Sequence, residues 1–345
     1  MAQSSKPRLA VTMGDVAGIG AEVIVAAWTR PEVHAHVLPL VVGHPEILRR
    51  AARLLEPDVD IVEFERTAVS RGQWAADAHT IACIRTGGDD ALDVPAGAVD
   101  ARAGEAAYQY VGLAARLALD HSVDGIVTAP LSKAALHAAG HHYPGHTELL
   151  AELCGVADFA MMLYLPPGSA VRGSAGLGVV HVTLHQSLRS VFDDLSTAAI
   201  LAKCRLADGA MRRLGVARPR LAVAAVNPHG GEDGLFGDEE TSVIAPAVAE
   251  ARQLGLDVAG PYPTDTLMVR ARDGEFDAVV AMYHDQGHIA LKLLGMHAAV
   301  NITLGLPIIR TSVAHGTAFD RAWQGTASAD GMVAALLTAG RLSKA

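Results

Sequence analysis

Short apolar runs rich in β-branched residues alternate along this chain with longer stretches rich in alanine and leucine. The first kind of segment is typical of strands buried in a parallel sheet, and the second is typical of the helices that cover such a sheet. The pattern therefore predicts an α/β fold. The expected strands are Leu9–Met13, Leu38–Gly43, Gly125–Thr128, Ala160–Leu165, Val179–Thr183, Leu221–Val226, Ala278–Met282 and Val300–Thr303.

The expected helices lie between these strands. They span Ala21–Thr29, Glu46–Leu55, Gly104–Asp120, Thr147–Cys154, Ser196–Leu214 and Thr241–Leu254. Two regions depart from the alternation. Residues 56–103 are more polar and predict a small antiparallel excursion, and residues 166–178, which are rich in Gly, Pro and Ser, predict an exposed hairpin connection between two strands.

The composition excludes several classes of protein. A formal net charge of −9 argues against binding to a nucleic-acid backbone, because such proteins need an excess of Lys and Arg on one face. The three cysteines are far apart and form no Cys-x-x-Cys pair, so we expect neither a disulfide framework nor a thiolate zinc site. No apolar run is long enough to cross a bilayer, and the start lacks the core of a signal peptide. We therefore expect a soluble, cytoplasmic protein without a membrane partner.

Three histidines directly follow strand patterns: His185, His229 and His284. Ligands of open α/β sheets bind outside the carboxyl ends of the strands, so three imidazoles from three such ends are suited to hold one divalent metal. A single histidine after a strand is usually an ordinary polar loop residue, but three in the same position favour metal ligation. By contrast, His181 lies within its strand and is interpreted as a packed structural residue.

Two polar residues follow His284. Asp285 is expected either to orient that histidine or to touch the metal itself. Lys292 lies in an apolar, helix-like stretch, where partial desolvation suits a proton donor or a carboxylate ligand. The alternative is a lysine whose stem passes through the apolar surface and carries its charge into water.

Further candidates for anion binding lie at other segment ends. His146 and Thr147 begin a helix, whose free N–H groups form an anion site with Thr147 as the expected N-cap. Arg310 follows an apolar segment and suits a carboxylate or phosphate. The Gly14–Gly20 loop resembles a phosphate cradle, but it matches neither the Walker loop nor the Rossmann glycine spacing.

Together these segments resemble the 4-hydroxythreonine-4-phosphate dehydrogenase family of vitamin B6 biosynthesis and its close relatives, from Val11 to about Met332. His288 and Ala290 differ from the B6 enzymes, as do Val16 and Ala21, where proline is common. Residues 186–189 and 192–197 resemble the branch that acts on 4-phosphorylated threonate or erythronate. The most specific strings are Thr128–Lys133, Tyr143–Glu148, Asn227–His229, Met282–Gly287 and Asn301–Thr317.

The resemblance implies a fold like that of the isocitrate and isopropylmalate dehydrogenases, with two α/β/α lobes flanking a cleft. It also implies a homodimer with the active site at its interface. We place residues 1–130 with 262–345 in the first lobe. Residues 131–261 form the expected second lobe, with the metal-site histidines and the dimer contacts.

The resemblance further implies roles for individual residues. His185, His229 and His284 are the implied metal ligands, with contributions across the dimer interface. Cofactor contacts are expected from Gly305, Thr311 and Asp320, and catalytic roles from Lys292 and Asp285. The implied substrate-binding residues are His146, Thr147, Lys292, Asn301 and Arg310.

The implied activity is oxidation, with decarboxylation, of 4-phosphooxy-L-threonine, 4-phospho-D-threonate or 4-phospho-D-erythronate. It requires NAD or NADP and one divalent metal (Zn, Mg, Mn or Co). Three alternatives stay open. A dehydrogenase of unphosphorylated aromatic cis-dihydrodiols has no use for the phosphate site, a metal-dependent hydrolase or lyase turns over without nicotinamide, and a metabolite sensor binds ligand without reducing NAD.

Overall fold

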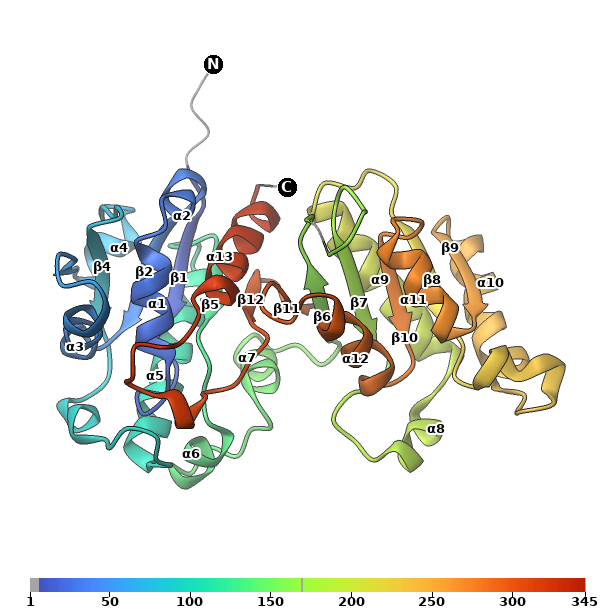
Figure 1. Ribbon diagram of the computed structural model, residues 1–345, viewed down its shortest axis with the longest axis horizontal. Helices are drawn as coiled ribbons and strands as arrows, with labels where there is room; N and C mark the ends of the chain where they lie inside the picture. The colour runs from blue at the N-terminus through green and yellow to red at the C-terminus, as the bar shows by residue number, and fades with distance from the viewer. Residues whose placement is uncertain (1–5, 169, 345) are drawn as a thin grey trace, which may run out of the picture. The chain divides into compact units, whose positions relative to one another are not determined.

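The structure is a computed structural model that describes residues 6–168 and 170–344. The described chain forms two compact units, residues 6–159 with 306–344 (unit 1) and residues 160–305 (unit 2). Both units are mixed α/β structures, as the sequence predicts (Figure 1). No helix among the described residues combines the length and the apolar composition that spanning a membrane requires.

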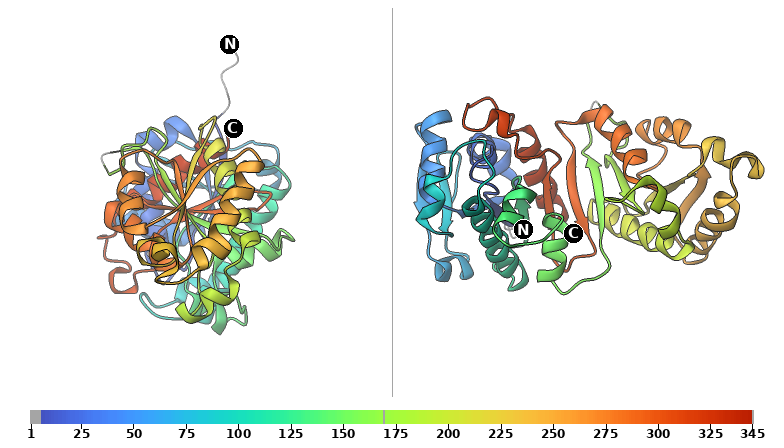
Figure 2. Two further views of the ribbon diagram at one scale, coloured as in Figure 1. Left: turned by 90° about the vertical axis from the view of Figure 1, so that its right-hand side faces the viewer. Right: turned by 90° about the horizontal axis from the view of Figure 1, so that it is seen from below.

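Unit 1 contains a parallel sheet in the order β3-β4-β2-β1-β5-β12. Its central strands are buried because α5 covers one face while α1, α3 and α13 cover the other (Figures 1 and 2). The strands are β1 (Arg8–Thr12), β2 (Leu38–Gly43), β3 (Asp60–Glu63), β4 (Thr80–Arg85), β5 (Gly125–Thr128) and β12 (Arg310–Val313). The helices are α1 (Gly20–Trp28), α2 (Pro31–His36), α3 (Pro45–Leu55), α4 (Arg66–Ser70), α5 (Ala101–Leu119), α6 (Lys133–Ala138), α7 (His146–Leu153) and α13 (Asp330–Leu342), with 3₁₀ turns η1 (Asp89–Asp93) and η5 (Phe319–Arg321).

Unit 2 contains a mixed sheet in the order β11-β6-β7-β10-β8-β9. The β6–β7 hairpin and the β11–β6 pair are antiparallel, whereas the pairs from β7 to β9 are parallel. The strands are β6 (Ala160–Leu165), β7 (Leu177–His181), β8 (Arg220–Ala224), β9 (Asp257–Tyr262), β10 (Ala278–Ala281) and β11 (Val300–Leu304). The helices are α8 (Val191–Asp194), α9 (Thr197–Arg213), α10 (Ala245–Gln253), α11 (Thr264–Arg272) and α12 (His284–Gly295), with short turns η2 (Leu188–Ser190), η3 (Pro228–Gly234) and the π-type η4 (Glu240–Ile244).

The division into units differs from the expected lobes. The boundaries lie at 159/160 and 305/306, rather than at 130/131 and 261/262. The reason is strand pairing, because β10 lies between β7 and β8 and β11 pairs with β6. These pairings place α12, and with it His284, in the same unit as His185 and His229.

The antiparallel excursion expected between residues 56 and 103 is confined to one isolated bridge between Asp77 and Thr80, and the strands of this region are parallel. β3 and β4 extend the parallel sheet of unit 1 beyond β2. The chain between them forms α4, which provides the crossover that two parallel neighbours require. The mostly exposed pattern of β3 explains why its sequence does not resemble a buried strand.

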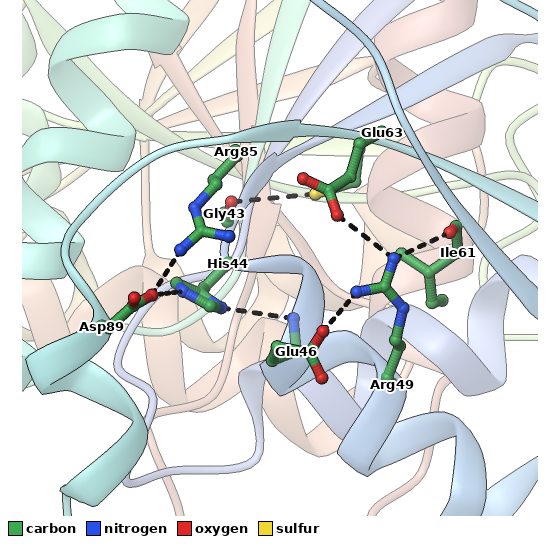
Figure 3. A network of polar contacts seen from close by, with 9 residues as sticks. Gly43, His44, Glu46, Arg49, Ile61, Glu63, Arg85 and Asp89 are labelled. Atoms are coloured by element: carbon green, nitrogen blue, oxygen red, sulfur yellow. Dashed lines mark hydrogen bonds and ion pairs between the residues drawn. The ribbon is translucent and has the colours of Figure 1, made fainter.

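A polar network ties this edge of unit 1 to α3 (Figure 3). Arg49 of α3 donates to the Ile61 carbonyl and to Glu63 of β3, both at 3.2 Å. The His44 ring accepts from the Glu46 N–H at 3.2 Å through Nδ1, and its Nε2 lies 2.9 Å from Asp89, which also pairs with Arg85. The network supplies the edge strand with contacts that its few apolar side chains do not.

Candidate functional site

The sheet order of unit 2 places the ends of three histidine-bearing segments side by side. β10 lies between β7 and β8, and all three strands run parallel. His185 follows β7, His284 follows β10 and His229 follows β8. The three segments therefore leave neighbouring strands at the same edge of the sheet, as the sequence pattern predicts.

His185 and His284 lie together. Their ring centroids are 5.9 Å apart. Two imidazoles that share one metal at nitrogen–metal distances of about 2.0–2.1 Å have ring centroids roughly 5–6 Å apart, so this pair fits a common ion. Both line a cavity of about 580 Å³, together with Leu184, Gln186, Ser187, Leu188, Val191, Tyr283 and Asp285.

Asp285 contacts the edge of the His284 ring. Its Oδ1 lies 2.6 Å from Nδ1 of His284 and accepts the proton of that nitrogen. The ring nitrogen Nε2 is thereby kept as the one suited to bind a cation, the arrangement found where a carboxylate orients a metal-binding histidine. Of the two expected roles for Asp285, this geometry favours orientation of the histidine.

His229 does not join the pair within the described part of the chain. Its ring lies 6.4 Å from that of Phe236, and no group of three His, Cys, Asp or Glu side chains within residues 6–168 and 170–344 is gathered closely enough to hold a metal ion. Its backbone is left-handed, with φ of 54°, and the next four residues are left-handed as well. Strained backbone of this kind concentrates at functional sites.

Glu240 holds the beginning of the His229 loop. Its Oε1 accepts the N–H groups of Val226 and Asn227, both at 2.8 Å, and its Oε2 accepts from the Asn227 amide at 3.0 Å. The carboxyl group is buried. A buried acidic side chain therefore supports the turn that presents His229.

Two more imidazoles complete a cluster in unit 2. The His288 ring stacks on that of His284 at 3.8 Å with an interplanar angle of 11°, and its Nδ1 lies 3.1 Å from Nε2 of His181. Burial lowers the pKa of His181 to about 3 and that of His288 to about 4. His181 is packed in β7, as predicted, whereas the sequence marks His288 only as a departure from the B6 enzymes.

In unit 1, His146 and Arg310 form a second candidate site. Arg310 is buried and His146 is half-buried, and the nearby Arg310 charge lowers the pKa of His146 further below the value that desolvation alone would cause. Burial also lowers the pKa of Arg310 to about 10, and the nearby charge of Glu148 partly opposes this shift. Arg310 donates to Thr128 Oγ1 at 2.8 Å. Nε2 of His146 is buried and has no hydrogen-bond partner among the described residues.

The strand order of the unit 1 sheet reverses between β1 and β5, because β2 lies on one side of β1 and β5 on the other. Ligands of such sheets bind in the crevice outside the strands at this point. Thr128 ends β5, and Arg310 of the neighbouring β12 reaches it. Arg310, with His146 nearby, thus lies at the part of the sheet where a ligand is expected.

One expectation in unit 1 is corrected, and another stays a prediction. Thr147 is not the N-cap of α7, because the helix already begins at His146, after an extended Gly145. The fully buried Thr311 donates its hydroxyl to the Ala335 carbonyl at 2.9 Å and so fastens β12 to α13, and its contact with a cofactor stays a prediction. The local sequence does not show that Thr311 pairs with Ala335.

The Gly14–Gly20 loop packs closely against neighbouring backbone. Gly14 has φ of +74°, and a Cβ atom there would lie 2.2 Å from the Pro130 carbonyl oxygen. A Cβ atom at Gly20 would meet the Met13 carbonyl oxygen at 2.2 Å. The glycines therefore allow close backbone packing after β1, which explains why the string resembles a phosphate cradle without its spacing.

The remaining expected residues are distributed over both units. In unit 2, Lys292 is half-buried on α12, Asn301 lies on β11 with a buried Oδ1 that lacks a partner among the described residues, and Gly305 follows that strand with φ of +88°. In unit 1, Asp320 is exposed in η5. Partial burial of Lys292 agrees with the expected desolvation.

Comparison with known proteins identifies relatives along nearly the whole chain. D-threonate 4-phosphate dehydrogenase of Salmonella typhimurium is 47% identical over 339 residues, which cover 97% of this chain and 98% of the relative. 4-Hydroxythreonine-4-phosphate dehydrogenase of Trichlorobacter lovleyi is 44% identical over 343 residues, 98% of each chain. The crystal structure of 4-hydroxythreonine-4-phosphate dehydrogenase from Klebsiella pneumoniae superposes with a TM-score of 0.86 at 44% identity, covering 98% of this chain and 100% of that one.

These relatives are oxidoreductases, which confirms the enzyme class predicted from the sequence. The family profile for the pyridoxal phosphate biosynthetic protein PdxA matches residues 35–339. With that match and with full-length relatives at 44–47% identity, the chain belongs to the PdxA family.

Proposed function

We propose that this chain is a nicotinamide-dependent, divalent-metal-dependent dehydrogenase that oxidises a 4-phosphorylated hydroxy acid with loss of carbon dioxide. The names of its relatives support this class of substrate. We place D-threonate 4-phosphate first because the relative named for it shares the higher identity, 47% against 44%. 4-Phospho-D-erythronate and 4-phosphooxy-L-threonine are the alternatives.

The pairing of the buried Arg310 with His146, whose Nε2 is buried, is the observation that carries the proposal. Arg310 is only 2% exposed, and a guanidinium shielded from water forms strong charge-assisted hydrogen bonds to phosphate and carboxylate oxygens. A substrate phosphate or carboxylate is the proposed ligand, and Nε2 of His146 is available to bond one of its oxygens. Such an anion site positions the substrate for reaction.

His185 and His284 are the proposed metal ligands of one chain, with Asp285 holding the His284 ring. When bound, a divalent cation stabilises the negative charge that develops on the substrate alcohol, and the nicotinamide of NAD or NADP accepts the hydride. Lys292 Nζ holds the proton that is transferred to the carbon left behind when carbon dioxide departs. The amide of Asn301 binds a substrate oxygen.

The metal is one of Zn, Mg, Mn or Co, and imidazole ligands favour the transition ions. For the cofactor we propose contacts from Gly305, Thr311 and Asp320, with the Thr311 hydroxyl proton already donated to Ala335. A location in the cytoplasm stays a prediction.

We propose that His229 acts across a homodimer interface, where it completes the ligand set of the other copy. The loop that bears it is apolar at its tip, with Leu235 71% exposed and Phe236 48% exposed. Leu188, in the segment that follows His185, is 63% exposed. Phe236 lies beside the His229 ring and Leu188 lines the cavity of His185 and His284. Exposed apolar residues next to candidate ligands are typical of a surface that another protein covers.

The test of the proposed function is a nicotinamide-reduction screen with the phosphorylated threonate, erythronate and hydroxythreonine, each beside its unphosphorylated counterpart. We expect turnover only with a phosphorylated substrate and an added divalent metal. Equal turnover without phosphate would favour a cis-dihydrodiol dehydrogenase instead. Substrate consumption without nicotinamide would favour a hydrolase or lyase, and binding without any turnover would favour a sensor.

The role of His229 has its own test. Mixing the H229A and H185A variants is expected to restore part of the activity, because a mixed dimer then contains one intact ligand set. The matched control mixes H185A with H284A, whose defects lie in the same half-site, and should stay inactive. Restored activity in that control, or none in the first mixture, contradicts the shared site.

A further inference from the structure

His288 lies between two other imidazoles of unit 2. One face of its ring stacks on His284 at 3.8 Å and 11°, and its Nδ1 shares a hydrogen bond of 3.1 Å with Nε2 of His181. His181 is 1% exposed and belongs to β7, and His288 is 7% exposed in the second turn of α12. A buried strand residue thus anchors the ring on which His284 rests.

The approach of α12 to β7 depends on Gly287. A Cβ atom at this position would lie 2.5 Å from Nε2 of His181 and 2.5 Å from Cγ1 of Val179. Only glycine therefore permits the first turn of α12 to come close enough for the hydrogen bond between His288 and His181. The neighbouring residues Gly287 and His288 act together in bringing the helix onto the strand.

The His284 ring is held in two complementary ways. Asp285 fixes its Nδ1 edge through the 2.6 Å contact, which leaves rotation about that hydrogen bond unopposed. His288 lies flat against the face of the ring and blocks that rotation. A ring held at both edge and face keeps its Nε2 aimed in one direction.

We propose that His288, anchored by His181, is a positioning residue that fixes the plane of the metal-binding imidazole of His284. The inference rests on the proposed function, because it takes His284 to be a metal ligand. His288 itself binds no metal in this account. Partners that orient a ligand histidine typically contribute 10–100-fold to metal affinity.

The experiment measures metal binding by the full-length protein after removal of metal with a chelator. Zn²⁺ affinity is obtained by competition with a chromophoric chelator, and the visible absorption of bound Co²⁺ reports the ligand geometry. The variants are H288L, which removes both stacking and hydrogen bond, and H288F, which keeps an aromatic face of similar size without the bond to His181. H284A removes the ligand, and H297L is the control for loss of an exposed histidine.

We expect H288L to weaken Zn²⁺ binding about tenfold or more and to change the Co²⁺ spectrum. H288F should lie between H288L and the wild type, and H297L should match the wild type. The phenylalanine variant preserves the packing volume, so it keeps the test valid should H288L unfold, as monitored by circular dichroism.

Two failures are distinguishable. Should H284A abolish binding while H288L and H288F bind Zn²⁺ like H297L with an unchanged Co²⁺ spectrum, His288 is a packing residue and the positioning role is refuted. Should H284A itself bind metal like the wild type, the proposed metal site is wrong and the positioning role falls with it.

Discussion

Replacing Asp15 by asparagine should change the pH dependence of the stability of unit 1. Asp15 follows β1 and is fully buried, and its Oδ1 accepts the Ala17 N–H at 2.8 Å. Burial raises the pKa of this carboxyl group from 3.8 to about 6, an effect that the Ala17 amide partly opposes and the charge of Asp100 reinforces. The folded state therefore holds this proton more tightly than the unfolded state does.

The magnitude follows from the two pKa values. Stability is greatest where both states are protonated, below pH 3.8, and it decreases as the pH rises through the folded pKa of about 6. A shift of about two pKa units changes the free energy of unfolding by about 3 kcal/mol in full. About 2 kcal/mol of this loss occurs between pH 4.5 and 7.5. The asparagine variant lacks this loss. Its free energy of unfolding should therefore rise by about 2 kcal/mol relative to that of the wild type over the same pH interval.

The assay is urea unfolding followed by tryptophan fluorescence. The three tryptophans of the chain, Trp28, Trp74 and Trp323, all belong to unit 1, so their emission reports the unit that contains Asp15. Any pH-independent effect of the new amide cancels when the two pH values are compared. D58N, at an exposed site, controls for the loss of one negative charge. A stability difference between D15N and wild type that stays constant from pH 4.5 to 7.5 would refute the reasoning.

Three further predictions concern packing, substrate binding and metal binding. A Cβ atom at Gly104 of α5 would lie 2.0 Å from the Ala135 carbonyl oxygen, so G104A should destabilise unit 1 by about 1–3 kcal/mol in the same unfolding assay. In the matched helical variant G209A, the new Cβ meets nothing within 4 Å among the described residues. This variant should instead stabilise α9 by up to about 1 kcal/mol. Similar effects at both sites would contradict the packing argument. R310K should raise the KM for the phosphorylated substrate about 10–100-fold in steady-state kinetics, because lysine lacks the forked donors that reach both Thr128 and an anion. An unchanged KM would show that Arg310 does not bind the anion. D285A should weaken Zn²⁺ binding about 10–100-fold, whereas D285N, which keeps an acceptor oxygen, should retain most of the affinity. Equal affinities of wild type and D285A would show that this carboxylate does not orient His284.

Strands whose own sequence carries the signal were predicted closely. β2, β5 and β6 begin and end at the expected residues, because each is an uninterrupted apolar run buried by helices. β9 and β12 were missed for a physical reason. β9 contains Gly260 and Pro261 and lies at the edge of its sheet, and β12 begins with an arginine that only the surrounding fold makes buried.

The sequence also determined the chemistry available at the strand ends. A histidine that directly follows a buried strand must leave the sheet at its carboxyl edge, so the positions of His185 and His284 follow from the chain alone. Their distance does not, because it depends on β10 lying next to β7, a pairing between residues about a hundred positions apart.

Only the tertiary structure decided which side chains support these groups. His288 contacts His181 across 107 positions, and Arg310 reaches Thr128 across 182. No local pattern encodes such pairs, since each depends on how a helix or strand packs against an element far away in sequence. The amino-acid sequence thus determined the reactive groups and the edge of the sheet at which they emerge. Burial and long-range contacts, which exist only in the folded chain, decided which of them are buried, which are oriented and which are left exposed.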